Sequence, residues 1–499
     1  MRSYLFLAAS AALSIAGPLQ AETLRQALVR AYQTNPALTG ARAGLRAIDN
    51  GVPLAKAAGR PSLSGTADYQ EFVQNSANSF TSPLRAATAG VNLNVPLYQG
   101  GRVRNSVSAA KARVEAGRAS LRSTEAILFE EIVAAYLDVA RDDVIVQLNM
   151  SNVNVLETNL QASRDRFEIG DLTLTDVAQS QARLALARGQ LETARAQLVA
   201  SRANYLRLVG VPPVNLQPPP ALPGLPATPA QAIDIALDNN PQLETAKAES
   251  VAARYDIGVE KASRLPRLSA IANGGYANYL GTLGGNLPGR TFFQTQNTVT
   301  VGLSATIPLY QGGAPAARVR RANELYGQSL EQIILVERAV VADARAAFSR
   351  YNAALQVIRS AQVAVEANEL AVEGVRAENT VGTRNVLDVL NAEQELLNSR
   401  VQLATARRDA YVAGFSLLAA IGKAEARDLG LFSEALYESG FGAGPAPEYQ
   451  PAEQAIPPSS SLGDPDEQRG GAPDNMRPIA LRNANRTSKP SARMIQRAR

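Results

Sequence analysis

Two aspartates occupy matching places in this 499-residue sequence. Asp176 and Asp388 each follow a glycine by six residues, in the pattern Gly-x5-Asp-Val. Carboxylates can act as a general acid and base, or they can attract cations and reject anions. The chain has no cysteine and no histidine, which excludes nucleophile systems and metal sites built on thiolate or imidazole. A carboxylate hydrolase should place two acids in one cleft, whereas these two belong to separate copies of one pattern. We therefore expect neither an enzyme nor a cofactor.

The same aspartates also have a purely structural explanation. Thr173-x-x-Asp176 and Asn385-x-x-Asp388 both match a capping box, in which an acid lies in the first turn of a helix near its positive end. Gly170 and Gly382 would then end the preceding helices in a left-handed conformation that glycine adopts cheaply. Capping and a charged pore are compatible, so the sequence leaves both interpretations open.

The helices that carry these aspartates belong to a sequence that is written twice. Gln99-Gly100-Gly101 recurs as Gln311-Gly312-Gly313, within the same hexapeptide Pro-Leu-Tyr-Gln-Gly-Gly. Counted from these turns without a gap, Gly210 meets Gly422. Helices packed in one array require such register, because one inserted residue rotates a helical face by about 100°. We expect two copies of one supersecondary unit side by side, with the glycine pairs forming strand-to-helix turns.

Composition and periodicity divide the chain into segments. Arg2, an apolar run and Leu19-Gln20-Ala21 predict an export signal, Pro-rich sequence predicts a linker, and the polar C-terminal sequence predicts disorder. Outside the signal, no apolar stretch is long enough for a transmembrane helix. The predicted order is signal 1–21, first repeat 22–210, linker 211–227, second repeat 228–422, an equatorial segment 423–440 and a tail 441–499. In the first repeat the β-hairpin covers 62–97, the long helix 102–167 and the return helix 174–209. The corresponding ranges in the second repeat are 267–308, 314–379 and 385–421.

The hairpin segments alternate apolar and small polar residues. Ala87, Ala89, Val91, Leu93 and Val95 alternate with Thr88, Gly90, Asn92 and Asn94, and 299–307 repeats the pattern. Strands of about nine to eleven residues with this alternation are typical of transmembrane barrels, and a soluble sandwich is the alternative. Four strands cannot close, and an open sheet edge is costly in lipid. Two chains would give a filled eight-stranded barrel and three a twelve-stranded barrel with a lumen, and we predict the homotrimer.

Each long helix carries two successive heptad series. Examples are Val107, Val114, Leu121 and Leu128, answered by Val319, Tyr326, Ile333 and Val340. A seven-residue repeat of this length predicts coiled-coil packing, and a helix of this size would be about 100 Å long. The first helix and the return helix together match the length of the long helix. The first helix is interrupted at Asn35-Pro36 and again near Pro53. We expect the first helix and the return helix to stack end to end beside the long helix. The second repeat should be arranged in the same way, with its first helix interrupted at Asn240-Pro241.

With the double repeat, the two hexapeptide turns and the paired tips, residues 22 to 440 resemble the TolC family of outer-membrane efflux and secretion ducts. The resemblance implies a mainly helical fold: a trimeric twelve-stranded barrel in the outer membrane of a Gram-negative cell, continued across the periplasm by a helical coiled-coil tunnel. It also implies that the closed far end opens when an ABC or RND inner-membrane transporter and a periplasmic adaptor (membrane fusion) protein dock.

The resemblance also assigns roles to residues at the two tips. Asp388 would belong to an acidic ring at the narrow end, and Arg384, Thr175 and Asp176 to links that keep that end shut. The adaptor would contact the following tip residues: Ile169, Gly170, Asp171, Val381, Gly382 and Thr383. The chain departs from the family at Asn391, where the family has a second acid, at Asn379, where it has a tyrosine, and at Asp171, where it has an apolar residue. We therefore expect about half the negative charge at the constriction, and a weaker latch.

The function that follows is an exit duct for a tripartite efflux pump or a type I secretion system. The alternative is a structural periplasmic coiled-coil protein with a soluble β-cap. The net charge of +5 is spread along the chain and indicates solubility rather than nucleic-acid binding. The cargo is not determined by the sequence, because the pump would select it.

Overall fold

The computed structural model describes residues 22–74, 82–284, 289 and 291–431, all of which belong to one unit. The predicted signal and tail lie outside the described residues, as does half of the predicted equatorial segment. The first half contains α1 (Leu24–Thr34), α2 (Pro36–Asp49), α3 (Gly51–Ala57), β1 (Ser62–Glu71), β2 (Arg85–Tyr98), α4 (Arg102–Glu168) and α5 (Leu174–Val209). The second contains α6 (Pro229–Asn239), α7 (Pro241–Lys261), the 3-10 turn η1 (Ala262–Arg264), β3 (Arg267–Asn278), β4 (Thr295–Thr306), α8 (Ala314–Thr380) and α9 (Val386–Ala420).

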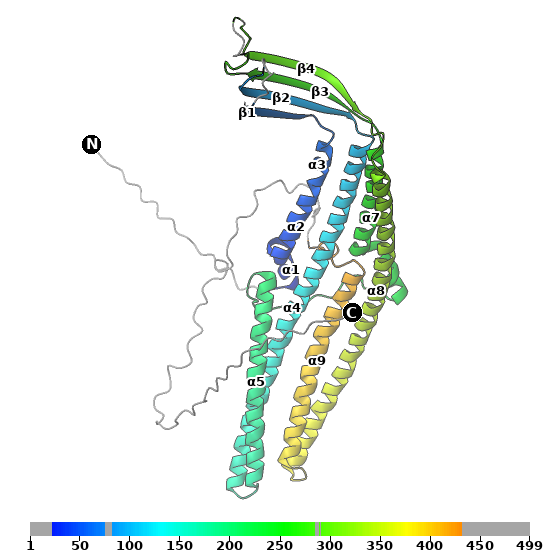
Figure 1. Ribbon diagram of the computed structural model, residues 1–499. Helices are drawn as coiled ribbons and strands as arrows, with labels where there is room; N and C mark the ends of the chain where they lie inside the picture. The colour runs from blue at the N-terminus through cyan, green and yellow to red at the C-terminus, as the bar shows by residue number, and fades with distance from the viewer. Residues whose placement is uncertain (1–21, 75–81, 285–288, 290, 432–499) are drawn as a thin grey trace, which may run out of the picture. The chain divides into compact units, whose positions relative to one another are not determined.

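The four strands form one antiparallel sheet in the order β1-β2-β3-β4, at one end of the helices (Figure 1). Leu63 pairs with Leu93, Leu93 with Ala272, and Ala272 with Val301. The next row pairs Ser64, Asn92, Asn273 and Thr300 across the same strands. Because paired residues point to the same side of a sheet, these rows place apolar side chains on one face and polar side chains on the other across all four strands. The alternation seen in single strands therefore becomes a property of the whole sheet.

Neither face of the sheet is covered by another layer of the described residues. Every residue of β1 and β4 is exposed, and Val299 and Val301 are each 81% exposed. Among the described residues, β1 and β4 also pair on one side only, which leaves two sheet edges open.

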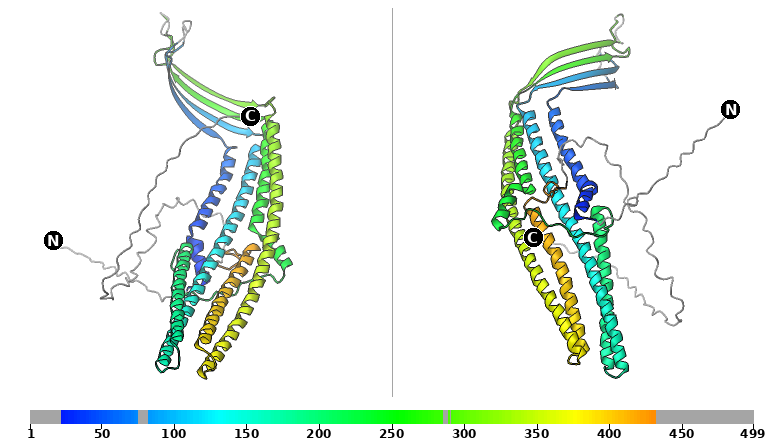
Figure 2. Two further views of the ribbon diagram at one scale, coloured as in Figure 1. Left: turned by 60° about the horizontal axis from the view of Figure 1, so that its bottom comes forward. Right: turned by 180° about the vertical axis from the view of Figure 1, so that it is seen from behind.

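Below the sheet, each long helix packs along shorter ones. α4 contacts α1, α2 and α3 and then α5, while α8 contacts α6 and α7 and then α9. α4 also packs on α7 and α9, and so joins the two halves of the molecule (Figure 2). α4 and α8 each contain 67 residues. Within the described ranges, no helix has the length and apolarity needed to cross a membrane.

The expected interruptions of the first helix have identifiable causes. α1 ends before Asn35-Pro36 and α6 before Asn240-Pro241, because the residue before proline is driven out of the helical conformation. The break expected at Pro53 falls slightly earlier, at Asn50 between α2 and α3. Pro53 lacks the N–H that would bond to the carbonyl of Asp49, and its ring displaces that carbonyl.

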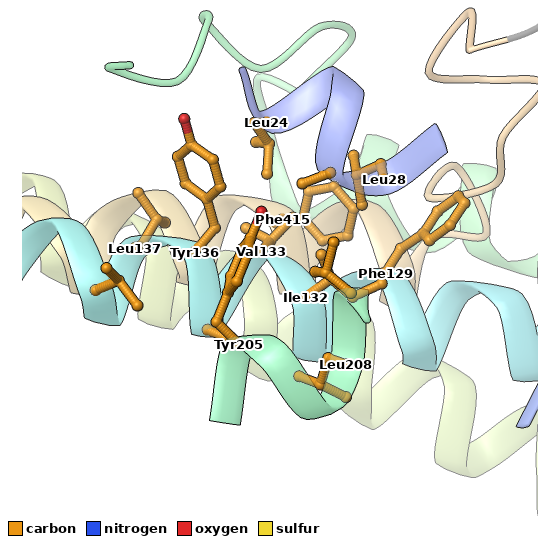
Figure 3. Packing of buried hydrophobic residues seen from close by; sticks show 14 of the residues in the cluster. Leu24, Leu28, Phe129, Ile132, Val133, Tyr136, Leu137, Tyr205, Leu208 and Phe415 are labelled. Atoms are coloured by element: carbon orange, nitrogen blue, oxygen red, sulfur yellow. The ribbon is translucent and has the colours of Figure 1, made fainter. Parts of the chain in front are cut away.

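Large apolar side chains meet where both halves come together. Figure 3 shows Leu24 and Leu28 of α1 against Phe129 and Ile132 of α4, with Phe415 of α9 close by. All five are buried. This core ties the start of the described chain to the end of α9, and it depends on residues from both repeats.

A buried ionic cluster lies beside this core. Nε of Arg122 is 2.7 Å from Oε1 of Glu425, and the same guanidinium also pairs with Glu244. Burial raises the pKa of the fully buried Glu425 carboxyl, and Arg122 opposes that effect. The cluster joins α4, α7 and the segment after α9.

Candidate functional site

The first tip closes α4 with a Schellman motif. The N–H of Gly170 donates to the carbonyl of Phe167 at 3.0 Å, and the N–H of Asp171 to that of Arg166 at 2.9 Å. Gly170 has φ +83°, which an L side chain rarely adopts. The carboxylate of Asp171 lies 2.6 Å from the guanidinium of Arg166, so it pairs within the tip. The preceding Ile169 is 80% exposed.

The second tip repeats this geometry at the end of α8. Gly382 has φ +78° and donates to the carbonyl of Asn379 at 3.1 Å, while the N–H of Thr383 donates to that of Glu378 at 3.0 Å. The preceding Val381 is 75% exposed. Each tip therefore presents one apolar side chain on a turn whose backbone is fixed by glycine. Both tips lie at the end of the helices away from the sheet (Figures 1 and 2).

The two aspartates differ in how they cap their helices. Asp176 completes a capping box, because its Oδ2 accepts from the N–H of Thr173 at 3.0 Å and from its hydroxyl at 2.7 Å. These hydrogen bonds from Thr173 lower the pKa of Asp176. At the second tip Asn385 caps the N–H of Asp388 at 2.8 Å. Among the described contacts, the N–H of Asn385 does not donate to the carboxylate of Asp388. The expectation of two capping boxes is therefore correct for the first tip and wrong for the second.

The Asp388 carboxylate lies near a cation instead. Its Oδ2 is 3.9 Å from Nη1 of Arg384, at the expected spacing of four residues. Arg384 is held more closely by Glu378, with 2.8 Å between Nε and Oε2. Asn379 fixes the same turn, because its side-chain amide donates to the carbonyl of Arg384 at 2.8 Å. No pattern in the sequence indicates Glu378, since its pairing with Arg384 depends on the folded turn.

The remaining predicted positions separate into two groups. Thr175 is exposed and makes no side-chain hydrogen bond within the described part of the chain. Asn391 is bonded across the molecule: its Oδ1 accepts from Nη2 of Arg183 at 2.7 Å, which links α9 to α5. Sequence reasoning missed Arg183, and the only local indication was its place one heptad after Asp176.

The strand-to-helix turns have the expected backbone. Gly101 and Gly313 immediately precede α4 and α8, with φ +78° and +79°, and Gly100 and Gly312 are also left-handed. The surroundings of the two turns differ. A Cβ on Gly100 would lie 2.8 Å from Cβ of Leu265, whereas a Cβ on Gly312 would meet open space.

The tips offer no arrangement for cofactor or metal chemistry. The described residues contain no group of three or more acidic side chains that could hold a metal ion. What the tips combine is exposed apolar side chains and paired charges. Such surfaces suit docking of another protein and control of passing ions.

Comparison with known proteins agrees with this architecture. The solved structure of the outer membrane protein VceC from Vibrio cholerae matches with a TM-score of 0.67 at 21% identity, covering 80% of this chain and 96% of that one. The fold is therefore that of an outer-membrane channel protein.

Sequence comparisons define the family. The sequence model described as "Outer membrane efflux protein" matches residues 27–211 and 232–423. The outer membrane efflux protein BepC of Brucella suis biovar 1 is 34% identical over 410 residues, which are 82% of this chain and 87% of that protein. The outer membrane protein TolC of Escherichia coli K12 is 26% identical over 84% of this chain and 85% of its own length. The chain belongs to the outer membrane efflux protein family.

Proposed function

We propose that this chain is one subunit of a trimeric exit duct, in which three sheets form a twelve-stranded barrel and the coils form a tunnel across the periplasm. The observation that carries the proposal is the sheet, which has an apolar and a polar face and which the described residues leave uncovered on both faces and open at both edges. Lipid would cover the apolar face and a wet lumen the polar face. Strand edges in lipid must be paired, which requires neighbouring subunits.

The alternative soluble β-cap is disfavoured by the same sheet. A soluble sandwich would bury its apolar face against a second layer. Here the apolar row ends on β4 with Val299 and Val301 almost fully exposed. Four strands also could not close a barrel alone.

The two strand-to-helix turns support a ring of internal repeats. Gly100 packs against Leu265, which follows the second repeat's first helices. At the matching turn, a Cβ built on Gly312 would meet no atom of the described residues within 4 Å. In a closed ring the first repeat of the next subunit would lie there, so six similar units would surround one axis. The two separate matches to the family model support this duplication.

At the tips we propose the gate and the docking surface. Three copies of Asp388 would surround the constriction, with Arg384, Thr175, Asp176, Asn379 and Asn391 around them. The exposed Ile169 and Val381 would contact a periplasmic adaptor, together with the turns at Gly170 and Gly382. An inner-membrane transporter would then deliver the cargo, as part of an efflux pump or a type I secretion system.

Two measurements on the purified outer-membrane protein test the proposal. Unheated samples should migrate as trimers in denaturing gels and convert to monomers on heating. Reconstituted trimers should conduct ions across planar bilayers. A water-soluble monomer without conductance would refute the duct and favour the soluble β-cap.

A further inference from the structure

Arg183 joins the two coils close to their tips. Its Nη2 donates to Oδ1 of Asn391 at 2.7 Å. Among the described residues, α5 and α9 share no other side-chain hydrogen bond or ion pair. Immediately beyond this bond the helices part around a cleft of about 1140 Å³, whose lining begins at Ala185 on α5 and at Gln394 on α9. The bond therefore marks the place where α5 and α9 meet.

The partner of Arg183 is neutral. The carboxamide of Asn391 accepts a hydrogen bond but does not offset a positive charge. No carboxylate of the described chain lies within ion-pair distance of Arg183. A guanidinium stays protonated at any physiological pH, so a full positive charge is placed here.

This charge lies on the face that carries Asp388. Asp388 and Asn391 are three residues apart on α9, and such residues are neighbours on one side of a helix. The group bonded to Asn391 is therefore next to Asp388 wherever that face is directed. Arg384 lies 3.9 Å from Asp388 and is paired with Glu378. The two positive charges of Arg183 and Arg384 therefore equal in number the two negative charges of Glu378 and Asp388.

We propose that Arg183 sets the charge selectivity of the constriction, and this rests on the proposed duct. Arg183 offsets Asp388, so that the constriction is nearly neutral instead of half as acidic as the family pattern implies. Anionic solutes then meet little electrostatic barrier and can pass as readily as cationic ones. Arg183 acts by its charge, and the bond to Asn391 holds that charge in place.

The test is the reversal potential of reconstituted trimers in a potassium chloride gradient. Arg183→Gln removes the charge from all three subunits and should raise the cation-to-anion permeability ratio at least about threefold, as expected for unit charges a few ångströms from the path. Arg188→Gln is the matched control, because Arg188 is on the same helix but pairs with Glu157 of α4 at 2.7 Å. It should leave the ratio unchanged.

Two further variants separate charge from hydrogen bonding. Arg183→Lys keeps the charge and should keep the wild-type ratio. Asn391→Asp adds a carboxylate directly beside Arg183 and leaves one uncompensated negative charge per subunit, so it should raise the ratio about as much as Arg183→Gln, and the two combined should raise it further. Asn391→Asp also provides the test if Arg183→Gln fails to assemble.

The outcomes distinguish this inference from the function on which it rests. Trimers of Arg183→Gln with wild-type selectivity would overturn the role of Arg183 and leave the duct intact. A shift in Arg183→Lys as large as in Arg183→Gln would also overturn it, because the charge would then not be responsible. So would an unchanged ratio in trimers of Asn391→Asp, because the pair formed by positions 183 and 391 would then lie away from the ion path. Absence of any conductance in the wild type would instead refute the duct itself.

Discussion

The side-chain amide of Asn35 donates to the main-chain carbonyl of Leu208 at 2.8 Å, and this bond joins two helices that are far apart in sequence. The Oδ1 of the same residue accepts from the N–H of Ala37 and caps α2. Asn240 makes the same pair of contacts, to the carbonyl of Ala420 at the end of α9 and to the N–H of Gln242 in α7. One asparagine in each half therefore connects the end of a return helix to the start of the next helix in the stack.

Replacing these asparagines should destabilise the stacked helices. Asn35→Ala removes a helix cap and leaves a buried carbonyl unpaired, so we expect a loss of roughly 2–3 kcal/mol in the free energy of unfolding. We expect a similar loss in the free energy of unfolding for Asn240→Ala. Asn50→Ala is the control, because its amide bonds only to the exposed carbonyl of Arg46. Urea unfolding of the purified protein measures all three, and equal losses at Asn35 and Asn50 would contradict the connecting role.

The glycines after the two return helices should differ in tolerance. Gly210 and Gly422 both have positive φ, which costs an alanine about 1 kcal/mol. A Cβ on Gly422 would also lie 2.3 Å from the carbonyl oxygen of Asn239, whereas the nearest atom to a Cβ on Gly210 is at 3.9 Å. We therefore expect Gly422→Ala to cost at least about 1 kcal/mol more than Gly210→Ala in the same unfolding assay. Equal costs would show that the backbone at Asn239 moves away freely.

The capping box at Thr173 should stabilise the first tip in a pH-dependent way. The pKa of Asp176 is lower in the folded chain than its usual value near 4. Its contribution is therefore complete above that usual value and is lost as the pH falls through the folded pKa. Thr173→Ala should destabilise the protein by about 1 kcal/mol at pH 7 and by less near pH 2, where the hydroxyl of Thr173 still accepts from the N–H of Asp176.

The neighbouring threonine provides the comparison for that experiment. Thr175→Ala removes an exposed hydroxyl without a described partner, so it should cause no loss at either pH. Thermal unfolding at several pH values compares the variants. A Thr173→Ala penalty that is the same at pH 2 and pH 7 would exclude the ionised Asp176 as the source.

Arg122 should be essential while Glu425 stays ionised. Arg122→Ala leaves the buried Glu425 carboxylate without its closest cation, and we expect a loss of roughly 3–5 kcal/mol. Adding Glu425→Gln removes the unpaired charge and should restore part of that loss. The yield of heat-stable trimers and the urea midpoint measure both steps. A double variant less stable than Arg122→Ala would contradict this account.

Asp388 should control cation preference if it lines the constriction. Asp388→Ala removes a carboxylate that is not used in capping, so the fold should tolerate it. Reconstituted trimers should show a cation-to-anion permeability ratio roughly threefold lower than the wild type and should be blocked less by multivalent cations. Asp176→Asn tests the other tip, where the carboxylate is bonded to Thr173, and should change selectivity less. Unchanged selectivity in Asp388→Ala would remove Asp388 from the constriction.

The sequence was sufficient to predict the structure wherever that structure depends on residues adjacent along the chain. Gly170 and Gly382 require positive φ, the prolines after Asn35 and Asn240 end the preceding helices, and strand alternation assigns each side chain to a face. These are local steric and hydrogen-bonding constraints, so the helix ends and turns could be placed within a few residues. The gap-free spacing of the two tips further indicated that both coils share one register.

Only the folded chain decided which side chains meet. Arg183 and Asn391 are brought together by the rotation of α5 against α9, and Arg384 turns toward Glu378 as well as Asp388. The two matching Gly-x5-Asp-Val patterns consequently differ in chemistry: Asp176 is bonded to its cap, while the Asp388 carboxylate is left beside a cation. Contacts between distant segments depend on the packing of whole helices, and a local pattern does not contain that information.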